Sequence, residues 1–299
     1  MQKDYESQSK GASSRAHIQE GSGDTTETQR SNKRRAERLV QQVKAAQEHA
    51  PQIRHLVEPN LERRRLVIEF FSRNFKDQEA AKDMLSSPSS FVKLPFPFLG
   101  IEPKRFRVPV DQKHYDYMGR EAFGSLVKAF DSMTGGIGLP NLWVYGLMGY
   151  GKSHLLATLT CFLTAYKYRV VYLPDCRVCH EDPVRYLQQS LLFAWCHLPD
   201  KVEEIIRLQD KDDVVNFIAN NRSTSVVFII DQLNALDDDD DTSTKTQTLR
   251  WLARCRSGLK SILSTSANNL SFHRMTQRQN YDRLFTVYGG FTKVRWRTF

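Results

Sequence analysis

The stretch that decides the fold is Gly146-Leu-Met-Gly149-Tyr-Gly151-Lys152-Ser153, which directly follows the apolar run Leu142–Tyr145. It fits the pattern G-x-x-x-x-G-K-[ST], and helical spacing begins immediately after it. Glycines let the backbone curl so that its N–H groups point at phosphate oxygens, and the start of a helix adds further unpaired donors. A strand, this loop and a helix in succession predict a phosphate-binding site rather than an ordinary glycine-rich turn.

The residues of this loop have separate predicted roles. We expect Lys152 to reach the β- and γ-phosphates of a nucleotide and the Ser153 hydroxyl to bind Mg²⁺, so the predicted cofactors are ATP and Mg²⁺. The predicted nucleotide-binding residues of the loop are Gly146, Leu147, Met148, Gly149, Tyr150, Gly151, Lys152, Ser153 and His154.

A second element supplies a carboxylate for the predicted metal site. The apolar run Val226–Ile230 ends in Asp231, and ligands collect at the carboxyl ends of parallel strands. A strand followed by a capping Asp is the alternative, but downstream of a phosphate loop the pattern favours a metal ligand. We predict that Lys152, Asp231 and Gln232 are the catalytic residues.

Gln232 bears on the rate of hydrolysis. Many P-loop ATPases carry a Glu at this place, whereas an amide can orient a water molecule but cannot act as a general base. This substitution predicts slow ATP turnover. Other polar residues could approach the γ-phosphate or could equally cap strands and turns: Asn234, Ser264, Thr265 and Ser266.

Short apolar runs alternate with longer segments of helical spacing over the middle of the chain. The runs are Leu142–Tyr145, Val170–Leu173, Val226–Ile230 and Ser261–Leu263, and the helical segments include His154–Tyr166 and Pro183–Leu198. This alternation predicts an α/β fold, a P-loop NTPase αβα sandwich with a mostly parallel central sheet.

The remainder of the chain divides by composition. Residues 1–30 are polar and predict a disordered tail, and residues 31–85 predict a basic helical region. Prolines in Leu94-Pro-Phe-Pro-Phe98 predict an extended linker or edge segment over residues 86–110. We assign residues 111–299 to the NTPase domain.

The net charge of +9 is unevenly distributed. Residues 1–107 carry +6, residues 108–249 carry −6 and residues 250–299 carry +9. A uniformly basic chromatin-coating protein is therefore excluded. The basic ends, residues 30–76 and 250–299, could contact nucleic acid, or their arginines could line the exposed faces of amphipathic helices.

Two basic clusters carry these alternatives. Arg63-Arg-Arg65, with the arginines and lysine between residues 30 and 38, could serve nuclear targeting or phosphate contact. Arg250 and Arg254 are i,i+4 neighbours that repel unless an anion lies near. Nucleic acid, the acidic run Asp237–Asp241, or another subunit in a self-associated form could supply that anion.

Other features bound the class of protein. No apolar run is long enough to cross a bilayer and no signal peptide is visible, so we expect an intracellular protein of cytoplasm or nucleus with no membrane partner. Five cysteines predict reduced thiols. Cys176-Arg-Val-Cys179-His180 fits a haem-attachment pattern and, with Cys196-His197, an irregular zinc set, but buried thiols are favoured. Asp237–Asp241 is favoured as a solvated loop.

A family resemblance adds to these inferences. Tyr117-Met-Gly119-Arg120-Glu121 resembles the box that opens the NTPase module of STAND-type AAA+ proteins, which implies that Gly119, Arg120 and Glu121 lie near the nucleoside. Together with Leu94–Phe98, Val144–Leu156, Val170–Arg177 and Phe228–Asn234, the series resembles the P-loop NTPase domain of Crinkler–RHS (retrotransposon hot spot) effector proteins over roughly residues 91–290.

The resemblance implies a STAND/AAA+-like ATPase, in a family whose members often act in the nucleus of a host cell. The chain ends soon after Gly289-Gly290, so we expect no full C-terminal lid or effector domain. Candidates for a γ-phosphate-sensing arginine are Arg274, Arg278 and Arg283. The predicted function is slow ATP hydrolysis used as a conformational or assembly switch. A non-hydrolysing nucleotide-bound scaffold and an ATP-dependent nucleic-acid-binding protein are the alternatives.

Overall fold

The structure is a computed structural model that describes residues 51, 53–100, 103–106, 113–133, 141–222, 225–238, 240–265 and 283–287. These residues all lie in one unit, Ala45–Phe299. The predicted tail 1–30, the first part of the basic helical region, Ser266, Arg274, Arg278 and the side chain of Arg283 lie outside the described residues.

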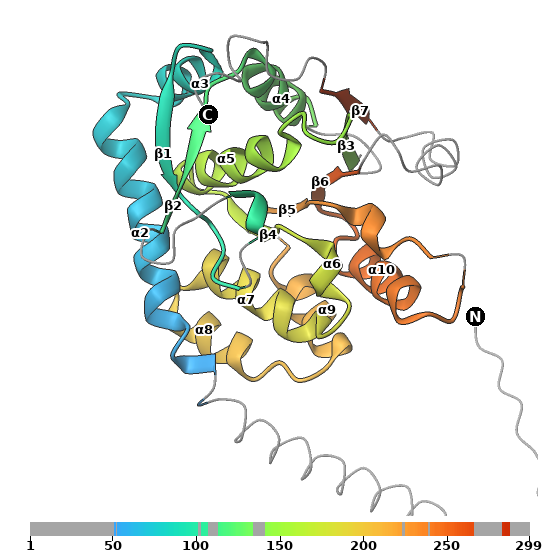
Figure 1. Ribbon diagram of the computed structural model, residues 1–299. Coiled ribbons are helices and arrows are strands. Elements are labelled where there is room, and N and C mark those ends of the chain that lie inside the picture. The colour runs from blue at the N-terminus through green and yellow to red at the C-terminus, as the bar shows by residue number, and fades with distance from the viewer. Residues whose placement is uncertain are drawn as a thin grey trace, which may run out of the picture. The chain divides into compact units, whose positions relative to one another are not determined.

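A five-stranded parallel sheet forms the centre of the fold (Figure 1). Its strand order is β4-β5-β6-β3-β7, with bounds β3 Asn141–Tyr145, β4 Arg169–Leu173, β5 Val226–Ile230, β6 Lys260–Ser264 and β7 Arg283–Thr286. The predicted α/β class is confirmed. All five residues of β5 are buried, as expected for a parallel strand covered on both faces.

The order of the strands positions the site. The strand before the phosphate loop, β3, pairs with β6 and β7 rather than with β4, the next strand along the chain. Consequently β6 lies between β3 and β5, and the end of β6 separates the phosphate loop from Asp231.

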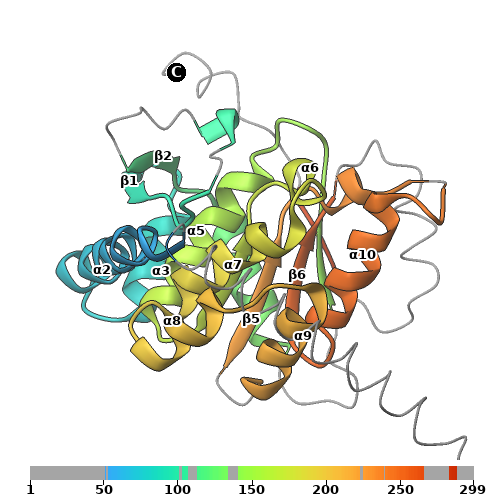
Figure 2. The same ribbon diagram turned by 90° about the horizontal axis from the view of Figure 1, so that it is seen from below.

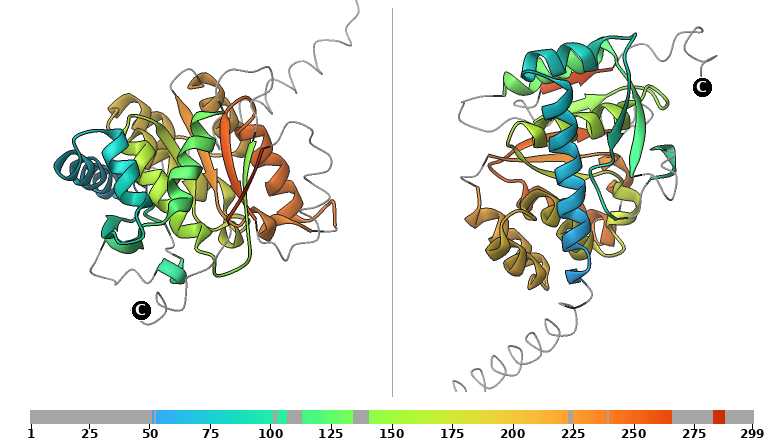
Figure 3. Two further views of the ribbon diagram at one scale, coloured as in Figure 1. Left: turned by 90° about the horizontal axis from the view of Figure 1, so that it is seen from above. Right: turned by 90° about the vertical axis from the view of Figure 1, so that its left-hand side faces the viewer.

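Helices cover both faces of the sheet. Helices α5 (Lys152–Ala165) and α7 (Pro183–Trp195) lie on one face, and α10 (Thr244–Cys255) lies on the other (Figure 2). Every residue of α5 from Leu155 to Thr164 is buried, because a further helix, α2 (Val57–Asn74), packs across α5 and α7 (Figure 3). The chain therefore forms an additional helical layer outside the sandwich.

The proline-spaced segment lies in the core. Strand β1 (Phe91–Pro95) pairs antiparallel with β2 (His114–Met118) in a separate two-stranded sheet. The side chains of Leu94, Phe96 and Phe98 are fully buried, so the prolines here fix an extended chain that packs rather than a solvated connection.

The remaining elements are short and are mostly capped by side chains. They are α3 (Gln78–Ser86), α4 (Glu121–Asp131), α6 (Cys176–Cys179), α8 (Pro199–Ile206), α9 (Lys211–Asn220), and the 3-10 helices η1 (Lys104–Phe106) and η2 (Leu233–Leu236). Asp77, Asp182, Asp210 and Ser243 each accept a backbone N–H at a helix start, which satisfies donors that would otherwise be unpaired. None of the described helices is both long and apolar enough to cross a membrane.

Candidate nucleotide site

The carboxyl ends of β3, β6 and β5 meet at one edge of the sheet, and each is followed by a polar segment. The phosphate loop follows β3, Thr265 follows β6, and Asp231 follows β5. The Thr265 backbone N–H donates to the Val144 carbonyl at 3.2 Å, which ties the end of β6 to the strand before the loop. The fold thus brings together the groups that the sequence predicts as a nucleotide site.

The loop has the backbone conformation that its glycines permit. Gly149 has φ of 86° and Gly151 has φ of 71°, in the left-handed region that side chains disfavour. Helix α5 begins directly after Gly151, so its first N–H groups face the loop. Leu147 and Met148 at the outer part of the loop are exposed, Met148 by 80%.

Lys152 folds back onto its own loop. Its Nζ donates to the Gly146 carbonyl at 2.6 Å and to the Leu147 carbonyl at 2.9 Å. Burial lowers the pKa of Lys152, and the charge of Asp231 opposes that shift. Carbonyl oxygens therefore hold the ammonium where a phosphate oxygen would be a stronger partner.

The Gly-Arg-Glu box contacts the loop through its arginine. Arg120 stands at the N-cap of α4, and its Nη1 donates to the Tyr150 carbonyl at 2.6 Å. Gly119 is needed for packing, because a Cβ there would overlap the Ser87 carbonyl oxygen. Glu121 is the exposed first residue of α4. The structure thus joins Arg120 directly to the phosphate loop.

Asp231 is 1% exposed and forms an ion pair that the sequence did not reveal. Arg105, on η1, places Nη2 at 3.1 Å from Asp231 Oδ2 and Nη1 at 3.2 Å from Asp175 Oδ2. Its Nη2 also donates to the Pro174 carbonyl. Asp175 pairs in addition with Arg177, which is 61% exposed. A guanidinium therefore occupies the cationic position beside the predicted metal ligand.

Gln232 has an unusual backbone. Its φ of 58° and ψ of 40° are left-handed, and its N–H donates to Asp231 Oδ1 at 2.9 Å. Such a conformation costs a residue with a side chain on the order of 1 kcal/mol and is concentrated at functional sites. The position directly after the metal-ligand candidate is therefore held in a strained geometry.

Two buried hydroxyls at the end of β6 have no hydrogen-bond partner among the residues that the structure describes. Ser264 Oγ and Thr265 Oγ1 are both fully enclosed, which normally costs about 1–3 kcal/mol for each unsatisfied group. Asn234 lies nearby in sequence on η2 and has a partner of its own. Orphaned hydroxyls, a phosphate loop and a buried carboxylate are the donor set that a nucleotide with Mg²⁺ requires, so the residues present fit that group.

His154, predicted as a nucleotide-binding residue, packs against aromatic rings. Its ring centroid lies 4.8 Å from that of Phe106 and 6.0 Å from that of Tyr115. Burial, with the charges of Arg120 and Arg105, lowers the pKa of His154 to about 4. His154 is therefore neutral at pH 7.

The C-terminal basic cluster is engaged by the protein itself. Arg250 Nη2 lies 2.7 Å from Asp241 Oδ1, and Arg254 Nη2 lies 2.9 Å from Asp212 Oδ1. Of the three anions considered for Arg250, the acidic run is the one that the structure supplies. The Lys260 ammonium lies 4.8 Å from the centre of the Phe130 ring.

The arginine run on α2 is divided: Arg65 lies on the exposed face, as the amphipathic-helix interpretation expects, whereas Arg63 and Arg64 do not. Arg63 and Arg64 are buried, and Arg63 Nη1 donates to the Phe96 carbonyl at 2.9 Å and to the Phe98 carbonyl at 2.7 Å. Arg65 is exposed and pairs with carboxylates on its own helix. Arg63 holds the proline segment against α2, and the buried Arg63 and Arg64 present no exposed basic face.

All five cysteines are buried free thiols. Within the part of the chain that the structure describes, no group of three or more His, Cys, Asp or Glu side chains could hold a metal ion. Burial raises the pKa of the Cys179 thiol to about 12. Cys176 and Cys179 belong to α6 in the core.

Residues 141–285 match the family model of the NACHT domain. NACHT domains are P-loop NTPases related to the STAND and AAA+ proteins, and the NACHT match runs from β3 into β7. It contains the phosphate loop, Asp231 and Gln232, whereas Arg105 and Arg120 precede it. The NACHT match supports nucleotide binding at the loop.

Three solved structures were matched at low identity. A DNA replication initiation factor has a TM-score of 0.33 at 16% identity, over 55% of this chain and 44% of that chain. PCH-2 of C. elegans has a TM-score of 0.31 at 13% identity, over 55% of this chain and 40% of that chain. The cytoplasmic domain of the Thermomonospora curvata Type VII secretion ATPase EccC has a TM-score of 0.26 at 15% identity, over 50% of this chain and 19% of that chain. This chain covers less than half of each of these proteins. No curated protein matches the sequence.

Proposed function

We propose that the chain is an ATP- and Mg²⁺-binding P-loop NTPase that hydrolyses ATP slowly and uses its nucleotide state as a conformational or assembly switch. The observation that carries this proposal is one sheet edge that holds Lys152 in a phosphate loop, the buried Asp231 carboxylate and two unpartnered hydroxyls. These groups converge where ligands bind in open parallel sheets.

Each residue has a role in this proposal. Lys152 exchanges loop carbonyls for phosphate oxygens, and Ser153 and Asp231 hold the metal, whose charge offsets that of the phosphates. Arg120 holds the loop through Tyr150, with Gly119 and Glu121 on the nucleoside side. Arg105 would have to release Asp231 Oδ2 before that oxygen could bind the metal, so metal binding would be coupled to movement of the Arg105 side chain.

Slow turnover follows from Gln232. The Gln232 amide can orient a water molecule but cannot accept a proton from it, and the strained backbone sets the direction of the Gln232 side chain. A steady-state assay of phosphate release should give a low rate that rises in Gln232→Glu and vanishes in Lys152→Ala. A parent rate already typical of fast ATPases, or no gain in Gln232→Glu, would contradict this part of the proposal.

A nucleotide-bound scaffold is the second candidate, and Gln232 is the observation that favours it. Purified protein that carries intact ATP, with no phosphate release over hours, would establish it over the hydrolytic switch. The Crinkler–RHS relationship and a nuclear site of action remain part of the proposal. An ATP-dependent role on nucleic acid is weakened at Arg250 and Arg254, because carboxylates already pair with them. A salt-titrated binding assay with DNA and RNA tests that role.

A further inference from the structure

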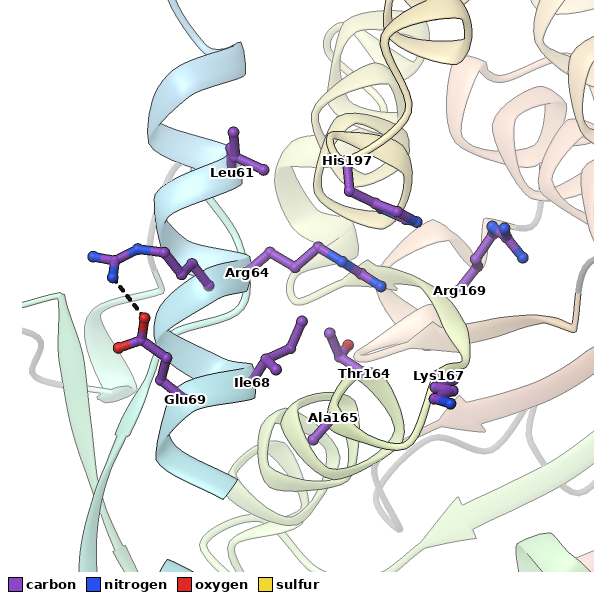
Figure 4. Close-up of a pocket in the computed structure, with 10 residues that line it drawn as sticks. Leu61, Arg64, Ile68, Glu69, Thr164, Ala165, Lys167, Arg169 and His197 are labelled. Atoms are coloured by element: carbon purple, nitrogen blue, oxygen red, sulfur yellow. Dashed lines mark hydrogen bonds and ion pairs between the residues drawn. The ribbon is translucent and has the colours of Figure 1, made fainter. Parts of the chain in front are cut away.

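A cavity of about 690 Å³ lies at the opposite end of α5 from the phosphate loop (Figure 4). It is bounded by α2, by the last turn of α5 with the turn that leads into β4, and by the segment after α7. Since α5 has 14 residues, about 21 Å of helix separates this cavity from Lys152. The volume is in the range of sites for small molecules.

Cationic side chains from three elements converge in the cavity. Figure 4 shows Arg64 of α2 reaching between His197 and Arg169. Arg64 is 7% exposed, and no carboxylate of a described residue lies within 4.0 Å of it. Its one hydrogen bond is a long one, from Nη1 to the Phe193 carbonyl at 3.5 Å. A guanidinium has five N–H donors, so most of its capacity for binding an anion is unused.

Among the described residues that line the cavity, the one carboxylate is already engaged. Glu69 lies 2.6 Å from Arg65 and 3.1 Å from Arg73, both on its own helix. Burial lowers the pKa of Arg64, and the charge of Arg169 lowers it further. A buried positive charge beside another is costly unless an anion compensates it.

A buried hydroxyl lines the same cavity without a partner. Thr164, in the last turn of α5, is 1% exposed and its Oγ1 makes no hydrogen bond. Thr160, one turn earlier, satisfies its hydroxyl by donating to the Leu156 carbonyl at 2.9 Å. Lys167, also in the lining, has a left-handed φ of 71°, a conformation that costs a side-chain-bearing residue energy.

The outer part of the cavity is apolar. Leu61 and Ile68 are 44% and 41% exposed and lie two turns apart on one face of α2. Ala165 of α5 adds to this wall. The lining therefore combines the buried Arg64 guanidinium and the Thr164 hydroxyl inside with exposed apolar side chains at the rim.

We propose that this cavity binds a small amphipathic anion, a carboxylate or a phosphate monoester attached to an apolar body. The acid group lies between Arg64 and Arg169 and accepts from the Thr164 hydroxyl, and the apolar body packs on Leu61 and Ile68. The enclosed position of Arg64 favours a small ligand over an extended polyanion. The site is independent of the nucleotide proposal, because none of its residues lies at the phosphate loop.

Calorimetric titration of the full chain with four probes tests the ligand class. Octyl phosphate and octanoate represent the two acid groups, octanol lacks the charge, and inorganic phosphate lacks the apolar body. At least one acid probe should bind about tenfold or more tightly than octanol and than inorganic phosphate. Equal affinity for octanol or for inorganic phosphate, or no binding of either acid probe, would overturn the proposal. The tighter of the two acids identifies the head group.

Two arginines provide a matched pair of variants. Arg64→Gln should weaken binding of the preferred probe by about tenfold or more, whereas Arg54→Gln should leave it unchanged, because Arg54 pairs with Glu203 and does not line the cavity. Thr164→Val keeps the shape and removes the hydroxyl. Thr164→Val should raise the melting temperature of the ligand-free protein and still weaken binding of the preferred probe. A raised melting temperature with unchanged probe affinity in Thr164→Val, together with an unaffected Arg64→Gln, would assign these groups to packing alone and refute the site.

Discussion

Near each end of α5 a histidine lies beside two arginines, but the two groups differ in their carboxylates. At the phosphate-loop end the charges of Arg105 and Arg120 act on His154, and Arg105 pairs with Asp175 and Asp231. At the other end Arg64 and Arg169 act on His197, and no described carboxylate lies within 4.0 Å of Arg64. At the first end Arg105 is paired with carboxylates of the protein, and a ligand that binds Arg105 must displace them. At the second end, Arg64 has no carboxylate of a described residue within 4.0 Å for a ligand to displace.

The largest expected effect concerns Lys152 against Lys167, the lysines near the two ends of α5. Lys152→Ala should weaken ATP binding about 100-fold or more, because it removes the charge that the loop directs at the phosphates. Lys167→Ala should leave ATP affinity unchanged. Fluorescence titration with a labelled ATP analogue measures both. Unchanged affinity in Lys152→Ala would remove the basis for a phosphate site at this end.

The next comparison is between the two histidines in acid. The pKa of His154 is lowered to about 4, below its value near 6.5 in an unfolded chain. The unfolded state therefore binds more protons between these values, and the free energy of unfolding should fall by roughly 2 kcal/mol as pH drops from 6.5 to 4. His154→Phe keeps an aromatic ring beside Phe106 and should remove most of that loss. Denaturant titrations at pH 7.5 and 4.5 measure it.

His197 supplies the control for this experiment. Its pKa is also lowered, by burial and then by Arg64 and Arg169, but its side chain is exposed at the rim of the cavity. His197→Gln should therefore change the acid sensitivity less than His154→Phe does. The reverse order would show that the cavity, and not the loop end, is the more strongly desolvated of the two.

Variants of Arg105 and Arg177 test whether the ion pair with Asp231 in particular competes with metal binding. Both pair with Asp175, but only Arg105 also pairs with Asp231. Arg105→Ala should lower the Mg²⁺ concentration that half-saturates nucleotide binding by about tenfold, since no internal cation then competes for the carboxylate. Binding of a labelled ATP analogue over a Mg²⁺ series measures this. Arg177→Ala should leave the midpoint in place. A higher midpoint in Arg105→Ala would mean that Arg105 supports metal binding instead of opposing it.

The smallest effect distinguishes two glycines within the loop. Both Gly149 and Gly151 have left-handed φ values, so alanine strains the backbone at either. A Cβ at Gly151 would also meet the Arg120 guanidinium, whereas a Cβ at Gly149 would have no atom of a described residue within 4 Å. Gly151→Ala should therefore cost about 1 kcal/mol more than Gly149→Ala in thermal or denaturant unfolding. Equal costs would show that Arg120 moves freely.

Much of the sheet could be predicted because its strands are buried on both faces. The runs that became β3, β4, β5 and β6 are rich in Val, Ile and Leu and stand between helical segments, which is the pattern of parallel strands. Strand β7, Arg283–Thr286, is shorter and has no such signal. It forms because it completes the edge beside β3.

The site was predictable where one local segment defines it and not where distant segments meet. The phosphate loop is contiguous, and Asp231 ends a recognisable strand. Arg105 pairs with Asp231 across 126 residues, and no spacing rule signals such a contact. Likewise, the sequence suggests that Arg64 belongs to an exposed basic run, but the packing of α2 on α7 buries it. The sequence gives the number of cationic side chains, but only the fold shows which of them pair with a carboxylate.

The insertion of β6 between β3 and β5 also constrains how the chain folds. Strands β4 and β5 pair with each other, but the strand that carries the phosphate loop has no partner until β6 and β7, far later in the sequence, have been made. Contacts of such long sequence separation form slowly because a large loop must close first. During synthesis the phosphate loop is therefore complete in sequence well before its strand can be anchored. A nucleotide that binds only the finished sheet would favour this late step by mass action.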